Sequence, residues 1–117
     1  ERQKVILAMS LAQQPKLLLR DEPTLHLDIN HQIEILELVR RLNKTQKLTV
    51  LAAMHDLNLA ALYFDRLVIL KNGSIAAQGK PSEVLTEKTI GDVFGTAVQV
   101  ELEPATGLPH VRILKPV

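Results

Sequence analysis

The chain has 117 residues, 46% of them hydrophobic and 23% charged, a composition that fits one modest globular domain with a single core. Its formal net charge of +1 gives no bulk attraction to nucleic acid or anionic lipid, and the absence of cysteine excludes disulfides and thiolate metal ligands. No apolar run approaches membrane-spanning length and no signal peptide is evident, so we expect a soluble chain. Because it begins without methionine, we also expect that an upstream part is missing.

The first expected element is a helix. Residues Glu1 to Gln14 carry apolar side chains at helical spacing, and Pro15 ends the pattern because its ring disfavours the helical conformation for the residue before it. The pattern predicts a helix that is buried on most of its surface. A short apolar strand, Leu17 to Arg20, is expected next.

Two adjacent carboxylates, Asp21 and Glu22, end this strand, and Pro23 forbids further regular pairing. In a parallel sheet the carboxyl ends of the strands form the edge where ligands bind, because crossover helices cover the faces. A carboxylate pair at that edge suits a metal ion and a general base. Acidic residues before proline also open simple turns, and this stretch alone leaves both interpretations open.

A strand, helix and strand follow in the order typical of a parallel sheet. Asp28 stands at the N-cap position of a helix, and Leu48 to Ala53 form a second apolar run that ends at His55. A short helix through Phe64 comes after it. If the two strands are parallel, Glu22 and His55 lie at the same edge of the sheet. The apolar face of the first of these helices carries Ile29, Ile33, Leu36, Val39 and Leu42.

The remainder predicts two hairpins separated by two short helices. The first hairpin turns at Asn72-Gly73, a dipeptide that tolerates positive φ angles. The two helices join at Thr86. The expected strands are Arg66 to Lys71, Ser74 to Gln78, Val98 to Leu102 and Val111 to Leu114, and the expected helices are Pro81 to Leu85 and Glu87 to Phe94.

The order of these motifs resembles the carboxyl-terminal half of the ATPase subunit of ABC transporters, over nearly all of the chain. Glu1-Arg-Gln resembles the end of the family's signature sequence, and Leu17 to Glu22 resembles the Walker B strand. Leu25-His-Leu-Asp28 resembles the D-loop, and His55 the switch histidine. The resemblance implies an α/β fold: a partial P-loop NTPase in which residues 1–117 form a parallel sheet with crossover helices plus a C-terminal β-hairpin region, without the Walker A half.

The resemblance also implies a role for each site residue. Asp21 would hold Mg²⁺, Glu22 would be the general base that polarises the attacking water, and His55 would contact the γ-phosphate of ATP. Glu1 would occupy the last signature position, Asp28 would lie across the boundary between two ATPase subunits, and both would belong to the ATP-binding site. Two simpler interpretations remain: Asp28 as a helix cap only, and His55 as the polar end of a strand. The other histidines, His26, His31 and His110, are expected at the surface.

Two features depart from the family pattern. Arg20 stands where the pattern has an apolar residue, and by strand alternation it shares a face with Glu22, which it could weaken as a base. The glycine-rich phosphate loop has no counterpart in these 117 residues, so the chain alone is expected not to hydrolyse ATP. In the family, the strand bearing that loop lies between the strand ending at His55 and the strand Leu67 to Leu70. We therefore expect these two strands either to pair directly or to recruit another chain, and we expect self-association.

Three segments resemble the ATPases of importers for iron-siderophore, haem or cobalamin: His26 to Gln32, His55 to Ala60 and Gly79 to Leu85. That resemblance implies ATP hydrolysis coupled to transport, with a homodimer of ATPase subunits on transmembrane permease subunits. It also implies a cytoplasmic location at the inner face of the cell membrane and no nucleic-acid partner. The alternatives are a soluble ABC-type ATPase of DNA repair or translation, and a non-catalytic interaction module. The near-neutral charge and the lack of a long coiled-coil insertion argue against the repair or translation class.

Overall fold

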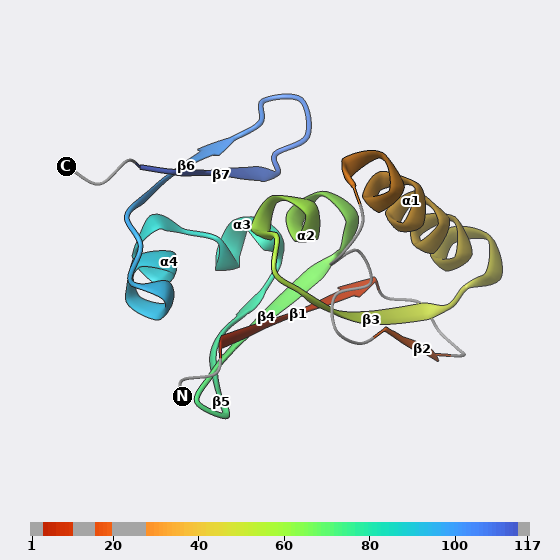
Figure 1. The fold of residues 1–117 in the computed structure, drawn as a ribbon, viewed down its shortest axis with the longest axis horizontal. Helices are drawn as coiled ribbons and strands as arrows, with labels where there is room; N and C mark the ends of the chain where they lie inside the picture. Colours follow the sequence, from red (N-terminus) through yellow and green to blue (C-terminus); the bar gives the residue numbers. More distant parts are fainter. Residues whose placement is uncertain (1–3, 11–15, 20–27, 115–117) are drawn as a thin grey trace.

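A computed structural model describes residues 4–10, 16–19 and 28–114 of the chain (Figure 1). The strands are β1 (Lys4–Ser10), β2 (Lys16–Leu19), β3 (Thr49–Met54), β4 (Arg66–Lys71), β5 (Ser74–Gly79), β6 (Val98–Leu102) and β7 (Pro109–Ile113), and the helices are α1 (Ile29–Gln46), α2 (Leu57–Tyr63), α3 (Pro81–Val84) and α4 (Glu87–Phe94).

The main sheet has the strand order β2-β3-β1-β4-β5, and β6 pairs with β7 as a separate ribbon. Strands β2 and β3 are parallel and are joined through α1, which confirms the predicted crossover. Strand β1 is antiparallel to both β3 and β4, so β2, β3 and β4 all run in the same direction. Strand β5 returns antiparallel to β4. The α/β fold class is confirmed, with antiparallel strands added to the parallel ones.

The predicted helix over Glu1 to Gln14 is wrong for residues 4–10, which form the central strand of the sheet. The run from Val5 to Met9 is apolar at every position, and such a run satisfies both the helical and the strand period. Tertiary pairing decides between the two, because β1 exchanges backbone hydrogen bonds with a neighbour on each side. In this register Ala8 lies opposite Ala52 of β3 and Leu67 of β4.

Strand β1 also occupies the gap that we expected between β3 and β4. The two strands therefore neither pair directly nor offer their inner edges to another chain. The outer strands of the sheet are β2 and β5. Self-association stays a prediction, but it no longer follows from an open gap in the sheet.

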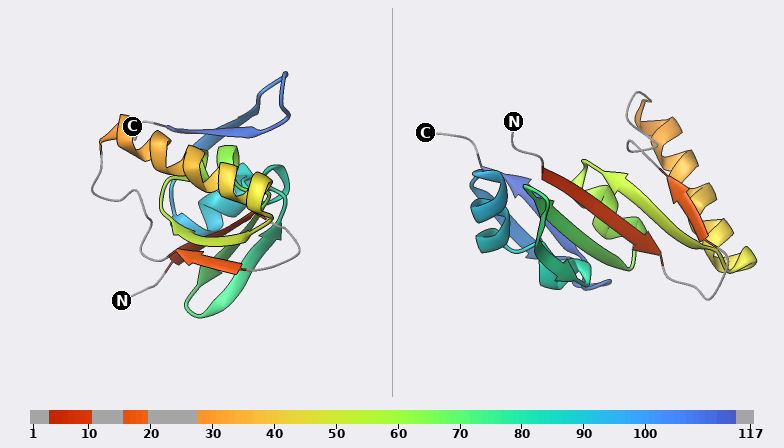
Figure 2. Two further views of the ribbon diagram at one scale, coloured as in Figure 1. Left: turned by 90° about the vertical axis from the view of Figure 1, so that its right-hand side faces the viewer. Right: turned by 90° about the horizontal axis from the view of Figure 1, so that it is seen from below.

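One cluster of buried side chains joins the sheet to the helices. In the centre of the sheet Ile6 lies between Met54 and Ile69, and all three side chains are at most 3% exposed. Helix α1 contributes Leu36 and Val39 to this core. Figure 2 shows α1 and α2 on one side of the sheet, with the β6-β7 ribbon beyond α2. In the described part of the chain, no helix is both long and apolar enough to cross a bilayer.

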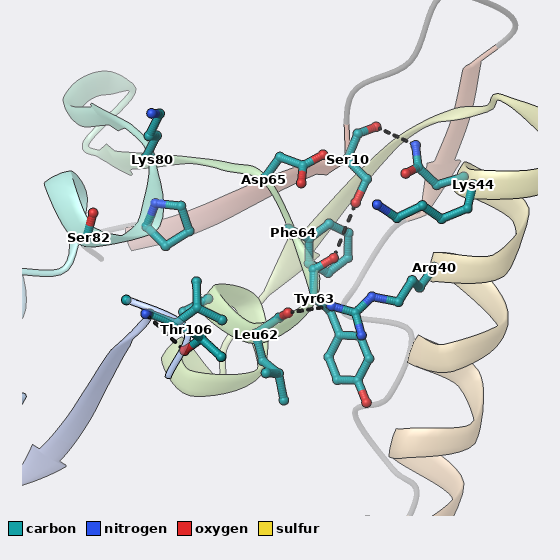
Figure 3. A pocket seen from close by; sticks show the side chains of 15 residues that line it. Ser10, Arg40, Lys44, Leu62, Tyr63, Phe64, Asp65, Lys80, Ser82 and Thr106 are labelled. Carbon is teal, nitrogen blue, oxygen red and sulfur yellow. Dashed lines mark hydrogen bonds between the residues drawn. The ribbon is translucent and has the colours of Figure 1, made fainter. Parts of the chain in front are cut away.

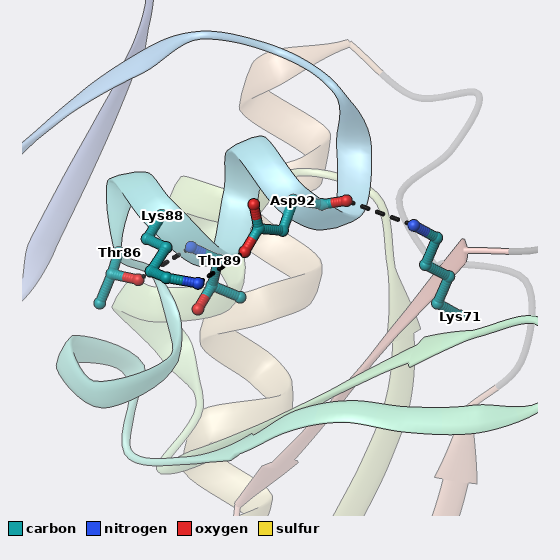
Figure 4. A network of polar contacts seen from close by, with 5 residues as sticks. All are labelled: Lys71, Thr86, Lys88, Thr89 and Asp92. Carbon is teal, nitrogen blue, oxygen red and sulfur yellow. Dashed lines mark hydrogen bonds and ion pairs between the residues drawn. The ribbon is translucent and has the colours of Figure 1, made fainter.

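The predicted hairpin turn at Asn72-Gly73 and the predicted junction of two short helices at Thr86 are confirmed. Asn72 and Gly73 adopt φ angles of 55° and 83° in the turn between β4 and β5. Thr86 lies between the two short helices, and its side chain accepts a hydrogen bond from the Thr89 backbone N–H at 3.1 Å (Figure 4). The Lys71 Nζ donates to the Asp92 carbonyl at 3.2 Å, which ties α4 to the end of β4.

Candidate functional site

The candidate site lies at the sheet edge where β2 and β3 end. The two strands are parallel, with Leu19 of β2 opposite Ala52 of β3, so their carboxyl ends reach the same edge. His55 follows the last residue of β3 directly and is exposed. The strand direction supports the predicted approach of Glu22 to His55. Glu22 itself lies outside the described residues.

Two other residues of the predicted site, Glu1 and Asp21, are also outside the described part, as is Arg20. Among the residues that the structure describes, no group of three or more His, Cys, Asp or Glu side chains could hold a metal ion. The predicted Mg²⁺ site therefore depends on Asp21, which lies outside the described residues. His31 and His110 are exposed, as predicted, and His26 lies outside the described ranges.

Asp28 is the N-cap of α1, as the sequence predicts. Its Oδ1 accepts a hydrogen bond from the His31 backbone N–H at 3.0 Å, and the His31 Nδ1 lies 3.2 Å from the same oxygen. Both side chains are exposed, about two-thirds of each being accessible. The capping role is thus confirmed, and a contact of Asp28 with a second subunit stays a prediction.

The segment after His55 is held by two side chains. The Oδ1 of Asp56 accepts from the Leu59 backbone N–H at 3.0 Å and starts α2. Asn58, two residues further on, bonds both backbone groups of Val111 in β7: its Nδ2 donates to the carbonyl at 3.0 Å, and its Oδ1 accepts from the N–H at 2.7 Å. A cavity of about 320 Å³ lies between His55 and β7, with Ile113 on its far wall.

Sequence reasoning missed Asn58. The signal that was available is a lone amide among the apolar side chains of Leu57 to Tyr63. A half-buried amide in such a helix needs hydrogen-bond partners, because burying it unpaired is costly. Nothing in the sequence shows that these partners are 53 residues away, in β7.

The chain was compared with known proteins, and no protein-family profile matches it. Petrobactin import ATP-binding protein FpuD of Bacillus anthracis is 46% identical over 109 residues, which are 93% of this chain and 40% of that protein. Cobalamin import ATP-binding protein BtuD of Halobacterium salinarum is 50% identical over 114 residues, 97% of this chain and 29% of that protein. Ferric enterobactin transport ATP-binding protein FepC of Escherichia coli is 42% identical over 111 residues, 95% of this chain and 41% of that protein.

A solved structure described as a metal-chelate type ABC transporter, in an inward-facing conformation, matches with a TM-score of 0.70. The match covers 86% of this chain and 40% of that chain at 22% identity, and it shows the fold alone. The fold is therefore that of part of an ABC ATPase, and the chain is homologous to the ATP-binding subunits of ABC importers. Within that class, these relatives are named for siderophore and cobalamin import. The chain spans between 29% and 41% of their length.

Proposed function

We propose that residues 1–117 are the C-terminal part of one nucleotide-binding domain in the ATP-hydrolysing subunit of an importer. The observation that carries this proposal is the identity of 42 to 50%, over at least 93% of the chain, to import proteins named as ATP-binding. The β2-α1-β3 unit supports it, because it brings the end of the Walker B strand and His55 to one edge of the sheet. The signature end, the Walker B carboxylates, the D-loop and the switch histidine would then follow in chain order.

The cargo of the whole transporter would be an iron chelate, haem or cobalamin. The names of the relatives support siderophore and cobalamin import. The subunit would be cytoplasmic, would lie at the inner face of the cell membrane, and would pair with a second copy on the permease subunits. ATP hydrolysis in that assembly would supply the free energy for transport.

The chain's own residues would divide the hydrolytic work between them. Glu22 would accept a proton from the attacking water, and His55 would donate a ring N–H to the γ-phosphate. Asp21 would hold the Mg²⁺, which when bound neutralises charge on the phosphates. Asp28 would lie across the boundary with a second ATPase subunit and would couple the two nucleotide sites. Glu1 would occupy the last position of the signature sequence.

The structure suggests how His55 would be kept in position. The histidine is the residue between the end of β3 and the Asp56 cap of α2, so both neighbouring elements limit its backbone. The hydrogen bonds of Asn58 to Val111 add a third point of attachment, to the β7 strand. A switch residue that must reach a phosphate benefits from such a fixed backbone, since positioning is most of phosphoryl-transfer catalysis.

The proposal is tested by uptake in cells that lack the subunit containing this chain. Labelled ferric siderophore, labelled haem and labelled cobalamin should be offered separately, with the wild-type subunit restored from a plasmid as the control. We expect uptake of one of these cargoes to be lost and then restored. Normal uptake of haem, cobalamin and iron chelates in the deleted strain would contradict the proposed function.

A further inference from the structure

A second cavity lies away from the candidate site and carries an excess of positive charge. It has a volume of about 480 Å³ and is bounded by α1, the end of α2, the start of α3 and the loop between β6 and β7 (Figure 3). None of the described residues lines both this cavity and the cavity beside His55. Among the described residues that line it, Arg40, Lys44 and Lys80 are basic and Asp65 alone is acidic, so these residues carry a formal charge of +2. We call it the Arg40 pocket.

Arg40 is fixed in place by its neighbours. Its Nη2 donates to the Leu62 carbonyl at 3.2 Å, and its Cζ lies 5.0 Å from the centre of the Tyr63 ring. The Tyr63 hydroxyl in turn donates to the Glu37 Oε2 at 2.7 Å. A guanidinium has five N–H donors in a fixed plane, so holding this plane against the ring sets the direction of its other donors.

Two lysines complete the positive lining. Lys44 follows Arg40 by one helical turn, which places it on the same face of α1, and Figure 3 shows its side chain extending towards Ser10 and Phe64. Lys80 comes from the opposite wall. Its backbone N–H, not its ammonium, donates to the Glu83 carboxylate at 2.9 Å. Within the described ranges, neither lysine ammonium takes part in an ion pair.

The remaining lining is partly apolar and partly hydroxylic. Leu62, Phe64 and Pro81 supply apolar walls, and Ser82 and Thr106 supply hydroxyl groups at the rim. Pockets of this size bind small molecules with a few polar groups that fix the orientation. Separate cations on two walls favour a ligand with at least two anionic groups over one with a single charge.

From this geometry we propose that the Arg40 pocket binds a small organic polyanion. Its anionic groups would bridge Arg40 and Lys44 on α1 to Lys80 at the N-cap of α3, with the ligand's carbon body against Leu62 and Phe64. The Asp65 carboxylate opposes such a ligand and limits its affinity. This proposal does not depend on ATP hydrolysis, because none of the residues to which we assign a role in hydrolysis lines the pocket.

The test is calorimetry of the 117-residue chain at low ionic strength with two probes, citrate and inorganic pyrophosphate. We expect saturable one-to-one binding that weakens as salt is added. Both probes carry several adjacent anionic oxygens, and their relative affinities distinguish two classes of natural ligand. Tighter binding of citrate indicates a polycarboxylate, and tighter binding of pyrophosphate indicates a phosphate ester. Circular dichroism should first show that the chain is folded. If neither probe then binds saturably, the proposal is overturned.

Matched variants decide whether the pocket is responsible. Lys44→Gln should weaken binding by about tenfold or more, the usual worth of one charge-assisted hydrogen bond. Lys88→Gln removes the same charge from an exposed lysine paired with Asp92, outside the pocket, and should leave affinity within about twofold. Asp65→Asn should tighten binding. Equal weakening by the Lys44 and Lys88 substitutions would show a general charge effect and would refute the site.

Discussion

At the scale of single residues, two polar side chains of α2 with distant partners fix this helix in the fold. Asn58 joins α2 to β7, and Tyr63 joins α2 to Glu37 of α1. Each contact links segments that are more than twenty residues apart in the chain. Both contacts therefore stabilise the packing of one element against another more than they stabilise either element by itself.

Replacing Asn58 with Ala should lower the free energy of unfolding by about 1–3 kcal/mol, because the Val111 backbone groups lose both partners. Denaturant unfolding followed by circular dichroism measures this loss. The control is Asn30→Ala, an exposed position in the first turn of α1, where a change within about 0.5 kcal/mol is expected. Equal stability of the Asn58 variant and the wild type would show that the two hydrogen bonds contribute nothing net.

Burial raises the pKa of the Tyr63 hydroxyl above its ordinary value of 10.0, and the hydrogen bond to the Glu37 carboxylate raises it further. The charge of Arg40 acts in the opposite direction. Tyr63 is the only tyrosine of the chain, so absorbance at 295 nm reports its titration alone. In Glu37→Gln we expect the pKa to fall towards the ordinary value, and a pKa that rises or stays unchanged would contradict this account.

The same shift has a consequence for stability. The folded-state pKa lies above the unfolded value, so the contribution of Tyr63 is fully present below the unfolded pKa of about 10. It is lost as the pH rises through the raised folded value. Unfolding should therefore become easier in strongly alkaline solution, and Tyr63→Phe should reduce this alkaline dependence.

At the scale of elements, the junction between β5 and α3 depends on a glycine. Gly79 has a φ angle of 147°, and a Cβ added there would lie 2.6 Å from the Glu83 Oε1. That oxygen accepts the Lys80 backbone N–H at the start of α3. A side chain at this position would strain the backbone and displace the carboxylate from the cap.

Gly79→Ala should therefore lower the free energy of unfolding by roughly 1–3 kcal/mol. Gly91→Ala is the matched control, because Gly91 lies inside α4 without a positive φ angle and its added Cβ would meet nothing within 4 Å. The control should be unchanged or more stable by up to about 1 kcal/mol. Thermal unfolding of the two variants side by side gives the answer, and equal loss in both would contradict the explanation.

Most elements of residues 28–114 could be predicted because their signals are local. Asp28 caps α1, and Asn72-Gly73 sets the hairpin turn, and both act on residues within four positions. The segment 4–10 could not be predicted, since its strand conformation depends on β3 and β4, which come some forty to sixty residues later in the chain. The contact of Asn58 with β7 could not be predicted for the same reason, because its partner is distant in the sequence.

At the candidate site the sequence predicted that β2 and β3 end at a common edge, and the parallel register confirms this. The arrangement of Asp21 and Glu22 stays a prediction.

At the scale of the whole molecule, the chain folds around a sheet whose central strand is β1, the first strand in the sequence. The 117 residues contain no glycine-rich phosphate loop, although the relatives are named as ATP-binding proteins and are more than twice as long. Positioning of the phosphates supplies most of the catalysis in this class. The chain by itself therefore has the candidate base and switch residue without the loop that would hold the nucleotide.

We therefore expect the isolated chain not to turn over Mg-ATP. A phosphate-release assay with the longer subunit as the positive control measures this directly. Turnover by the isolated chain that approaches the rate of the longer subunit would contradict the assignment of residues 1–117 to only part of a nucleotide-binding domain.

We expect Glu22 to be the general base for ATP hydrolysis in the longer subunit, and Glu22→Gln in that subunit is the direct test of this role. ATP turnover and ATP binding should be measured on the same preparation, with Glu34→Gln, an exposed change on α1, as the control. We predict that turnover falls by roughly two to four orders of magnitude, the usual worth of a positioned base, while ATP binding is retained and the control is unaffected. Turnover of the Glu22→Gln subunit at the normal rate would contradict the account.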